Sequence, residues 1–102
     1  MPLKRLKRKL TKEIMWLYLL KLLSEKPRYG YELKKEIQHR FNFNPAIVTS
    51  YAVLYTLELK GYVKTIWKSA KKRPRKYYVI TKKGKKLLLD GKKYLRDITK
   101  KI

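Results

Sequence analysis

Residues 62–81 read YVKTIWKSAKKRPRKYYVIT, and this stretch decides the fold. Its two ends, Tyr62–Lys68 and Lys76–Thr81, are rich in β-branched and aromatic residues, which is typical of strands. The segment between them contains a proline, and seven bases with no acid occur from Lys64 to Lys76. The stretch therefore predicts a two-stranded antiparallel hairpin with a basic tip.

A strongly apolar helix is expected well before this hairpin. Thr11 is a candidate N-cap, and Glu13 follows in the first turn, where the helix dipole favours an acid. Residues 14–20 are apolar on every side, whereas a surface helix of a small monomer shows one apolar stripe. Pro27 ends the helix. Such a helix needs cover on two faces, so the domain core is expected on one and a second subunit on the other.

Two further helices are expected between Pro27 and the hairpin. Residues 30–41 carry apolar side chains at four-residue spacing, and Asn42 suits the left-handed turn that closes a helix. Thr49 or Ser50 caps the next helix, and Gly61 stops it. The order helix, helix, helix, strand, strand is that of a winged helix-turn-helix.

The two ends of the chain complete the expected organisation. Residues 82–101 are expected to be helical, with a seam at three- and four-residue spacing formed by Leu88, Gly91, Leu95, Ile98 and Ile102. We predict a mainly α fold with a small antiparallel β-hairpin. Its parts are a basic arm (1–10), a winged helix domain (11–81) and a C-terminal dimerisation helix (82–102). Trp16 joins Leu88, Gly91, Leu95 and Ile98 as a candidate dimer contact, since burial is a more frequent role for such an aromatic than lining a ligand pocket.

Charge and composition limit the classes of function. The chain of 102 residues has 29 Lys and Arg against 7 Asp and Glu, a net charge of +22, which implies a polyanionic partner. Cysteine is absent and one histidine, His39, is present, so we expect no metal site, no cofactor and no enzyme activity. The longest apolar run is too short to cross a bilayer, and we expect a cytoplasmic protein.

Three motifs resemble the PadR-like transcriptional regulators. Residues 22–33, LLSEKPRYGYEL, look like the family's turn between its first two helices. Residues 49–61 are similar to its recognition-helix pattern, and residues 73–84, with RPRKYY at their start, look like its wing. The resemblance implies groove contacts by residues of the third helix, Thr49, Ser50, Tyr51 and Tyr55, and wing contacts by Arg73 and Arg75.

The residues themselves agree with this assignment and extend it. Lys71 and Lys72 belong to the basic tip, and Arg28 and Tyr29 precede the second helix, where they could reach backbone phosphate. The role of Tyr55 stays open, since this residue could equally be a core aromatic. One of Tyr77 and Tyr78 is expected to lie in the core and the other on its flank. Trp67 is expected to serve packing.

The sequence thus predicts a sequence-specific regulator that binds double-stranded DNA, as a homodimeric repressor on a near-palindromic operator. A non-specific architectural DNA-binding protein is the alternative, since the charge suits it equally well. A small-molecule effector near Trp16 is conceivable, but the scarcity of acids there does not favour a cationic one. Membrane-surface binding by the arm would leave the hairpin without a role, so no membrane partner is expected.

Overall fold

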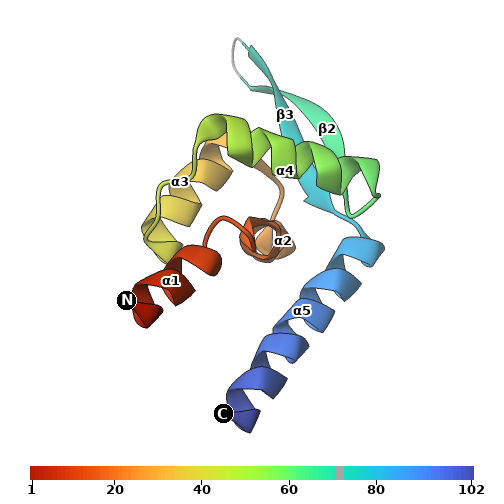
Figure 1. Cartoon of the computed structure of the whole chain (residues 1–102). Helices are drawn as coiled ribbons and strands as arrows, with labels where there is room; N and C mark the ends of the chain where they lie inside the picture. Colours follow the sequence, from red (N-terminus) through yellow and green to blue (C-terminus); the bar gives the residue numbers. More distant parts are fainter. Residues whose placement is uncertain (71–72) are drawn as a thin grey trace.

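In the part of the chain that the structure describes, four helices precede the hairpin and one follows it (Figure 1). The first lies in the basic arm, and the other three are those that the spacing of apolar residues predicts. The structure is a computed structural model, and it describes residues 1–70 and 73–102. The elements in chain order are α1 (Pro2–Lys9), α2 (Met15–Glu25), β1 (Arg28–Tyr29), α3 (Gly30–Phe41), α4 (Ile47–Leu59), β2 (Val63–Ala70), β3 (Arg73–Ile80) and α5 (Lys82–Lys101). The mainly α, winged helix-turn-helix arrangement is confirmed, with α4 in the place of the recognition helix.

The hairpin, here called the wing, is longer than predicted and belongs to a three-stranded sheet. Strands β2 and β3 pair antiparallel from Val63 opposite Ile80 to Ala70 opposite Arg73. Strand β1, which the sequence did not predict, pairs antiparallel with β3 through Tyr29 opposite Tyr77. Because β1 is so short, β3 has an open edge at Pro74, and a proline is tolerated at such an edge.

Helix α2 is the centre of the core. Met15, Leu19, Leu20 and Leu22 are fully buried, and α3, α4, α5 and β3 all contact this helix. Truncating one of these side chains to alanine would cost about 2–5 kcal/mol. The expectation that α2 is covered on more than one side is right within the single chain, where α5 provides one of the covers.

Two helices begin elsewhere than predicted. Helix α2 starts at Met15 and is separated from α1 by a turn, in which the Thr11 hydroxyl donates to the Arg8 carbonyl at 2.8 Å instead of capping a helix. Helix α4 starts at Ile47, so neither Thr49 nor Ser50 is its N-cap. Ala46 holds that place, and its extended backbone after Pro45 begins the helix without a side-chain cap.

The predicted ends of α3 and α4 are confirmed, and each is followed by a residue with left-handed backbone conformation. Asn42 closes α3 with φ of 59°, and Gly61 follows α4 with φ of 79°, both in the left-handed region. Thr81 is the N-cap of helix α5, and its hydroxyl accepts a hydrogen bond from the Gly84 amide at 3.1 Å. Gly84 packs so closely on the Tyr62 carbonyl that a Cβ would overlap it.

The wing and the chain termini lie at opposite ends of the molecule. Figure 1 shows β2 and β3 projecting from one end, while α1 and α5 extend toward the other, where both termini lie. Helix α4 crosses between α3 and the base of the wing. Across residues 1–70 and 73–102, no helix combines the length and apolar character needed to cross a membrane.

Candidate nucleic-acid interface

A notch of about 510 Å³ lies between the wing, the start of α3 and the first half of α4. It brings together four of the residues predicted to contact DNA, two aromatic and two basic: Tyr29, Tyr51, Arg73 and Arg75. Its other lining residues are Gly30, Tyr31, Trp67, Pro74, Lys76 and Tyr78. The basic hairpin and the recognition helix therefore border one concave surface, as their predicted role requires.

Tyr51 is fixed in this notch by a glycine. Its side chain lies over Gly30, the first residue of α3, so closely that a Cβ there would come within 2.5 Å of the phenol oxygen. The residue is still 48 % exposed. Gly30 thus allows the ring of α4 to rest on the backbone of α3 while its hydroxyl remains at the surface.

Aromatic rings hold the cations of the wing on its outer face. The Arg75 guanidinium lies 4.5 Å from the ring centroid of Tyr29, and Lys68 Nζ lies 5.1 Å from that of Tyr77. The two tyrosine rings meet edge to face at 5.5 Å. A cation stacked on a ring face keeps most of its hydrogen-bond donors free, so these side chains have donors available at the surface.

Trp67 is a site residue that sequence reasoning missed. It was expected to pack in the core, but it is 68 % exposed and lines the notch. In the hairpin register it lies opposite Lys76, on the strand face that carries the buried Tyr78. The wing extends past the helical body, so nothing covers that face at Trp67. Register counting from Tyr78 could have placed Trp67 beside Lys76 on this face of the hairpin.

Tyr77 and Tyr78 behave as predicted. Tyr78 is 5 % exposed and belongs to the core, while Tyr77 is half-buried on the opposite face. Desolvation by burial raises the pKa of Tyr78, so this phenol stays neutral. The alternation anchors the base of the wing in the core and leaves Tyr77 to support Lys68.

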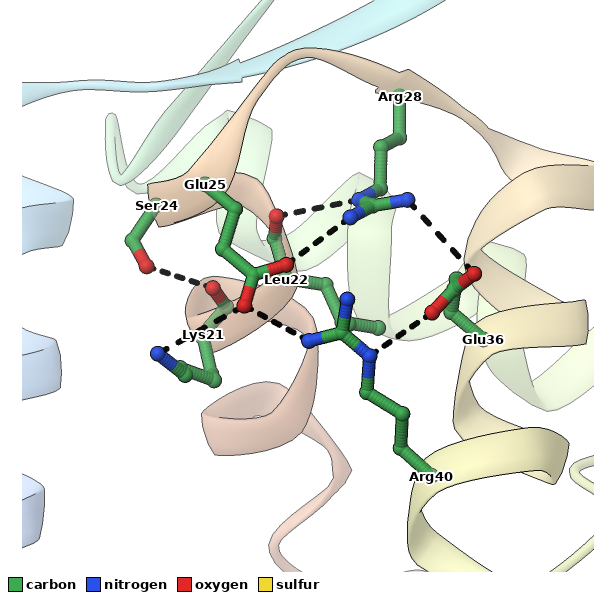
Figure 2. Close-up of polar contacts among 7 residues, drawn as sticks. All are labelled: Lys21, Leu22, Ser24, Glu25, Arg28, Glu36 and Arg40. Carbon is green, nitrogen blue, oxygen red and sulfur yellow. Dashed lines mark hydrogen bonds and ion pairs between the residues drawn. The ribbon is translucent and has the colours of Figure 1, made fainter.

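Arg28 does not reach solvent, and its expected phosphate contact is corrected. Its side chain is 7 % exposed, and its guanidinium is held inside the α2–α3 turn (Figure 2). Nε donates to the Leu22 carbonyl at 3.2 Å, and a terminal nitrogen binds Glu25 at 2.9 Å. Arg40 bridges Glu25 at 2.7 Å and Glu36 at 2.9 Å. A buried cation needs such partners, and here they bind α2, β1 and α3 together.

Glu25 carries the strongest electrostatic effect of this cluster. The hydrogen bond from Arg40 and that from Arg28 lower the pKa of Glu25 to about 2, with Coulombic help from Lys21. The carboxylate is therefore ionised throughout the neutral range. It is a structural counterion, because it faces the turn and not the notch.

The α4 candidates do not share one face, and the expected groove contact of Ser50 is corrected because the residue is buried. Ser50 is 5 % exposed, and its hydroxyl donates to the Ala46 carbonyl at 3.1 Å. Thr49 lies on the flank away from Tyr51, because two residues along a helix turn the side chain by about 200°. On that flank it lines a second cleft, of about 610 Å³, with Trp16, Val48, Ala52, Val53, Thr56, Leu57, Lys60, Tyr62 and Leu87.

Tyr55 is a surface residue. It is 63 % exposed, so the alternative of a core aromatic does not hold. Lys71 and Lys72, the other predicted contacts at the tip, lie outside the described residues. His39 is exposed, in agreement with its expected position on the polar face of the helix.

The candidate dimer contacts divide into two groups. Leu88 is 6 % exposed, and a Cβ at Gly91 would lie 3.0 Å from Leu17 and 3.2 Å from Trp16. These two positions of α5 therefore pack within the chain, which corrects their assignment to a dimer seam. Leu95 and Ile98, further along α5, are 36 % and 38 % exposed and remain at the surface.

The acidic side chains are all paired with basic side chains or with a backbone amide of the same chain. Since they are far fewer than the bases, most of the positive charge has no acidic partner. Each of the seven accepts a hydrogen bond or an ion pair from the chain: Glu13, Glu25, Glu32, Glu36, Glu58, Asp90 and Asp97. Within the part of the chain that the structure describes, no group of three or more His, Asp or Glu could hold a metal ion.

Comparison with known proteins places the chain in a family. The model of the transcriptional regulator PadR-like family matches residues 19–90. An uncharacterised protein of Lysinibacillus sphaericus is 41 % identical over 73 residues, which are 69 % of this chain and 67 % of that protein.

Solved structures agree with the sequence match. A PadR family transcription regulator from Clostridium difficile R20291 is 31 % identical, with a TM-score of 0.79 over 83 % of this chain and 90 % of its own. Bacillus subtilis PadR, solved in complex with operator DNA, shares the fold at 21 % identity, with a TM-score of 0.68 over 76 % of this chain and 46 % of its own. That family comprises transcription regulators rather than enzymes, in agreement with the expectation from the sequence. The protein belongs to the PadR-like family of transcriptional regulators.

Proposed function

We propose that the protein binds double-stranded DNA sequence-specifically, as a homodimer, and represses transcription from a near-palindromic operator. The observation that carries this proposal is the shared notch, which is lined by Tyr51 of α4 and by Arg73 and Arg75 of the wing. A reader of duplex DNA needs a helix for the groove and cations for the flanking phosphates at one surface.

The dimensions of α4 suit the major groove. A helix with its side chains is about 10–12 Å across, and the groove of B-DNA is about 12 Å wide. With α4 in the groove, the sugar–phosphate backbone would run through the notch and meet the bases of the wing. Bacillus subtilis PadR was solved with operator DNA, and its fold is shared by this chain, which supports the same use of the surface here.

Dimerisation would use the distal part of α5. Leu95, Ile98 and Ile102 continue the three- and four-residue spacing past the part that packs on α2, and all three are exposed in the single chain. Two chains joined through this region would present two copies of α4. Half-sites would then be about 34–36 Å apart, one helical turn of DNA.

Repression would follow from occupancy. A dimer on two successive major grooves covers the duplex that polymerase must enter. Since the ligand is genomic DNA, this activity belongs to the cytoplasm.

Selection of bound duplexes from a random library, with light scattering of the complex, tests the proposal. We expect an inverted-repeat consensus bound by two chains, and reduced transcription in vitro when the consensus overlaps a promoter. Binding by a single chain would contradict the proposed homodimer. A consensus that leaves transcription unchanged would contradict the proposed repression.

The net charge of +22 favours one alternative, a non-specific architectural DNA-binding protein. Charge alone supplies sequence-independent affinity through counterion release. The same selection separates the two functions, because an architectural protein would enrich no consensus while still binding every duplex.

A further inference from the structure

Helix α4 has a composition unlike that of a helix that reads bases by hydrogen bonding. Its 13 residues, IVTSYAVLYTLEL, include one charged residue and no Lys, Arg, His, Asn or Gln. Guanidinium and amide side chains are the groups that bind guanine and adenine edges in pairs of hydrogen bonds. α4 therefore has none of the usual bidentate readers.

Three of the polar side chains of α4, Ser50, Thr56 and Glu58, are bound within the chain. Glu58 accepts a hydrogen bond from Thr65 at 3.0 Å and an ion pair from Lys76 at 3.7 Å, which directs it toward the wing. The Thr56 hydroxyl donates to the Ala52 carbonyl at 3.1 Å, and the Ser50 hydroxyl is similarly bound to its own helix.

The outward face of α4 is an exposed apolar stripe. Val48 is 81 % exposed, Tyr55 63 % and Leu59 69 %, and Ala52 between them is also exposed. Positions 48, 52, 55 and 59 follow one another at four, three and four residues, so they form a single line along the helix. This stripe faces away from the core, and Val48 and Ala52 on its one edge also border the cleft beside Trp16.

The charges around the stripe indicate what covers it. Arg73 and Arg75 border α4 across the notch, and the whole chain carries +22. A second copy of the chain on this face would bring like charges together, and Glu58, the one acid of α4, is already neutralised by Lys76. The fitting occupant is a polyanion with apolar groups at its surface. In the major groove of DNA, the apolar group is the C5-methyl of thymine.

We propose that α4 recognises its DNA sites through thymine methyl groups, packed against the stripe formed by Val48, Ala52, Tyr55 and Leu59. This inference rests on the proposed function and adds the chemistry of base selection to it. The wing and its cations supply affinity for the backbone, and the stripe supplies preference for sites with thymines at defined positions.

The test replaces thymine by deoxyuridine, which removes the methyl group and preserves base pairing. A selected duplex of about 24 base pairs, two half-sites with flanks, is prepared with thymine, with deoxyuridine in the half-sites, or with deoxyuridine in the flanks alone. Burial of one methyl corresponds to a factor of about three to five in affinity. We expect a loss of at least about tenfold for the half-site substitution and no loss for the flanks.

Two variants connect the effect to α4. Val48→Ala should weaken binding to the thymine duplex and leave binding to the deoxyuridine duplex unchanged, since the contact is already missing there. Val48 is so exposed that the fold should persist. Ile66→Ala, a matched truncation of a 37 % exposed side chain on the wing, should keep the ratio between the two duplexes.

The outcomes separate this inference from the proposed function. If both duplexes bind with equal affinity, or if the selected half-sites contain no thymine, methyl recognition is wrong while DNA binding stands. If neither duplex is bound, the proposed function fails as well.

Discussion

At the turn between α2 and α3, one buried guanidinium joins three segments. Arg28 binds the Leu22 carbonyl and Glu25 of α2 and lies 4.0 Å from Glu36 of α3, while its own backbone forms β1 (Figure 2). Because β1 pairs with β3, the cluster also fixes the base of the wing relative to the helices. A single side chain thus links helical packing to the position of the wing.

Replacing this arginine should destabilise the fold. Arg28→Met leaves a buried carbonyl and part of the charge on Glu25 and Glu36 without a partner. Breaking a buried pair costs about 3–5 kcal/mol, and since Glu25 is 32 % exposed we expect the lower end of that range. Urea unfolding measures this loss in the free energy of unfolding. Lys64→Met on the exposed wing should change stability by less than about 0.5 kcal/mol, and equal losses in both variants would contradict the role of the cluster.

Acid should weaken the same cluster. The pKa of Glu25 is lowered from its ordinary 4.5 to about 2 in the folded chain, chiefly by the hydrogen bond from Arg40. The stabilisation is therefore complete above pH 4.5 and lost as the pH falls toward 2. Circular dichroism of urea unfolding between those values should show a decline that Glu25→Gln flattens. Glu13→Gln, in an exposed pair with Lys9, should keep the wild-type slope.

The position of Tyr51 depends on the absence of a side chain at Gly30. Gly30→Ala should push the phenol out of the notch, because a Cβ would meet the ring at about 2.6 Å. The displaced group is the end of a flexible side chain, so we expect a change in stability within about 1 kcal/mol. DNA affinity should fall about as far as in Tyr51→Ala. In the double variant the two losses should not add, and unchanged affinity in Gly30→Ala would refute the placement of Tyr51 at the interface.

At the scale of elements, the wing and α4 divide the proposed work between charge and shape. The bases of the wing rest on tyrosine rings, and the exposed stripe of α4 formed by Val48, Ala52, Tyr55 and Leu59 is uncharged. Salt should therefore act on the contribution of the wing, while sequence preference resides in α4.

Removing the wing arginines should weaken binding to all duplexes alike. Arg73→Ala combined with Arg75→Ala removes two phosphate contacts, so the slope of log affinity against log salt should become less steep by about 1.8, at about 0.9 per phosphate. Filter binding over a range of salt measures this slope. Lys86→Ala, which removes an exposed base paired with Asp90 on α5, should leave it unchanged. An unaltered slope in the double variant would remove the wing from the interface.

At the scale of the whole molecule, α5 has two halves that differ in burial. Its first half covers α2, and its second half leaves the body and carries exposed apolar residues (Figure 1). A short apolar seam is marginal as an isolated helix and is stabilised by packing on a partner. The proposed dimer would supply that packing.

Substitutions in the two halves of α5 should therefore have different results. Leu95→Asp with Ile98→Asp should give a folded monomer, because both side chains lie at the surface of the single chain. Leu88→Asp should unfold the protein, since it buries a charge in the core. Light scattering with circular dichroism distinguishes the two. A folded dimer in the first variant would contradict the proposed seam.

Much of this architecture could be predicted from the sequence, and the misses have physical reasons. Apolar periodicity identified α3 and α5, and Asn42 and Gly61 end helices because they adopt positive φ. The start of α4 was misplaced, since the extended backbone at Ala46 begins the helix where no capping side chain marks it. Strand β1 was missed, because two residues carry no periodic pattern.

The candidate site was predicted less evenly. Tyr51, Arg73 and Arg75 lie together as expected, since motif and charge marked them. Arg28 and Ser50 lie inside the chain, because whether a polar residue is buried depends on partners distant in sequence, such as Glu36 for Arg28 and Met15 for Ser50.

The two tryptophans lie at different surfaces of the molecule, Trp67 in the notch and Trp16 in the cleft between α4 and α5. Indole fluorescence responds to its surroundings, so the chain contains two intrinsic optical reporters. With Trp16 replaced by phenylalanine, emission would follow the arrival of a duplex at the wing. With Trp67 replaced, emission would follow the docking of helices around α2. Stopped-flow mixing of each variant, with a duplex or with denaturant, would thus time the two events separately without any added dye.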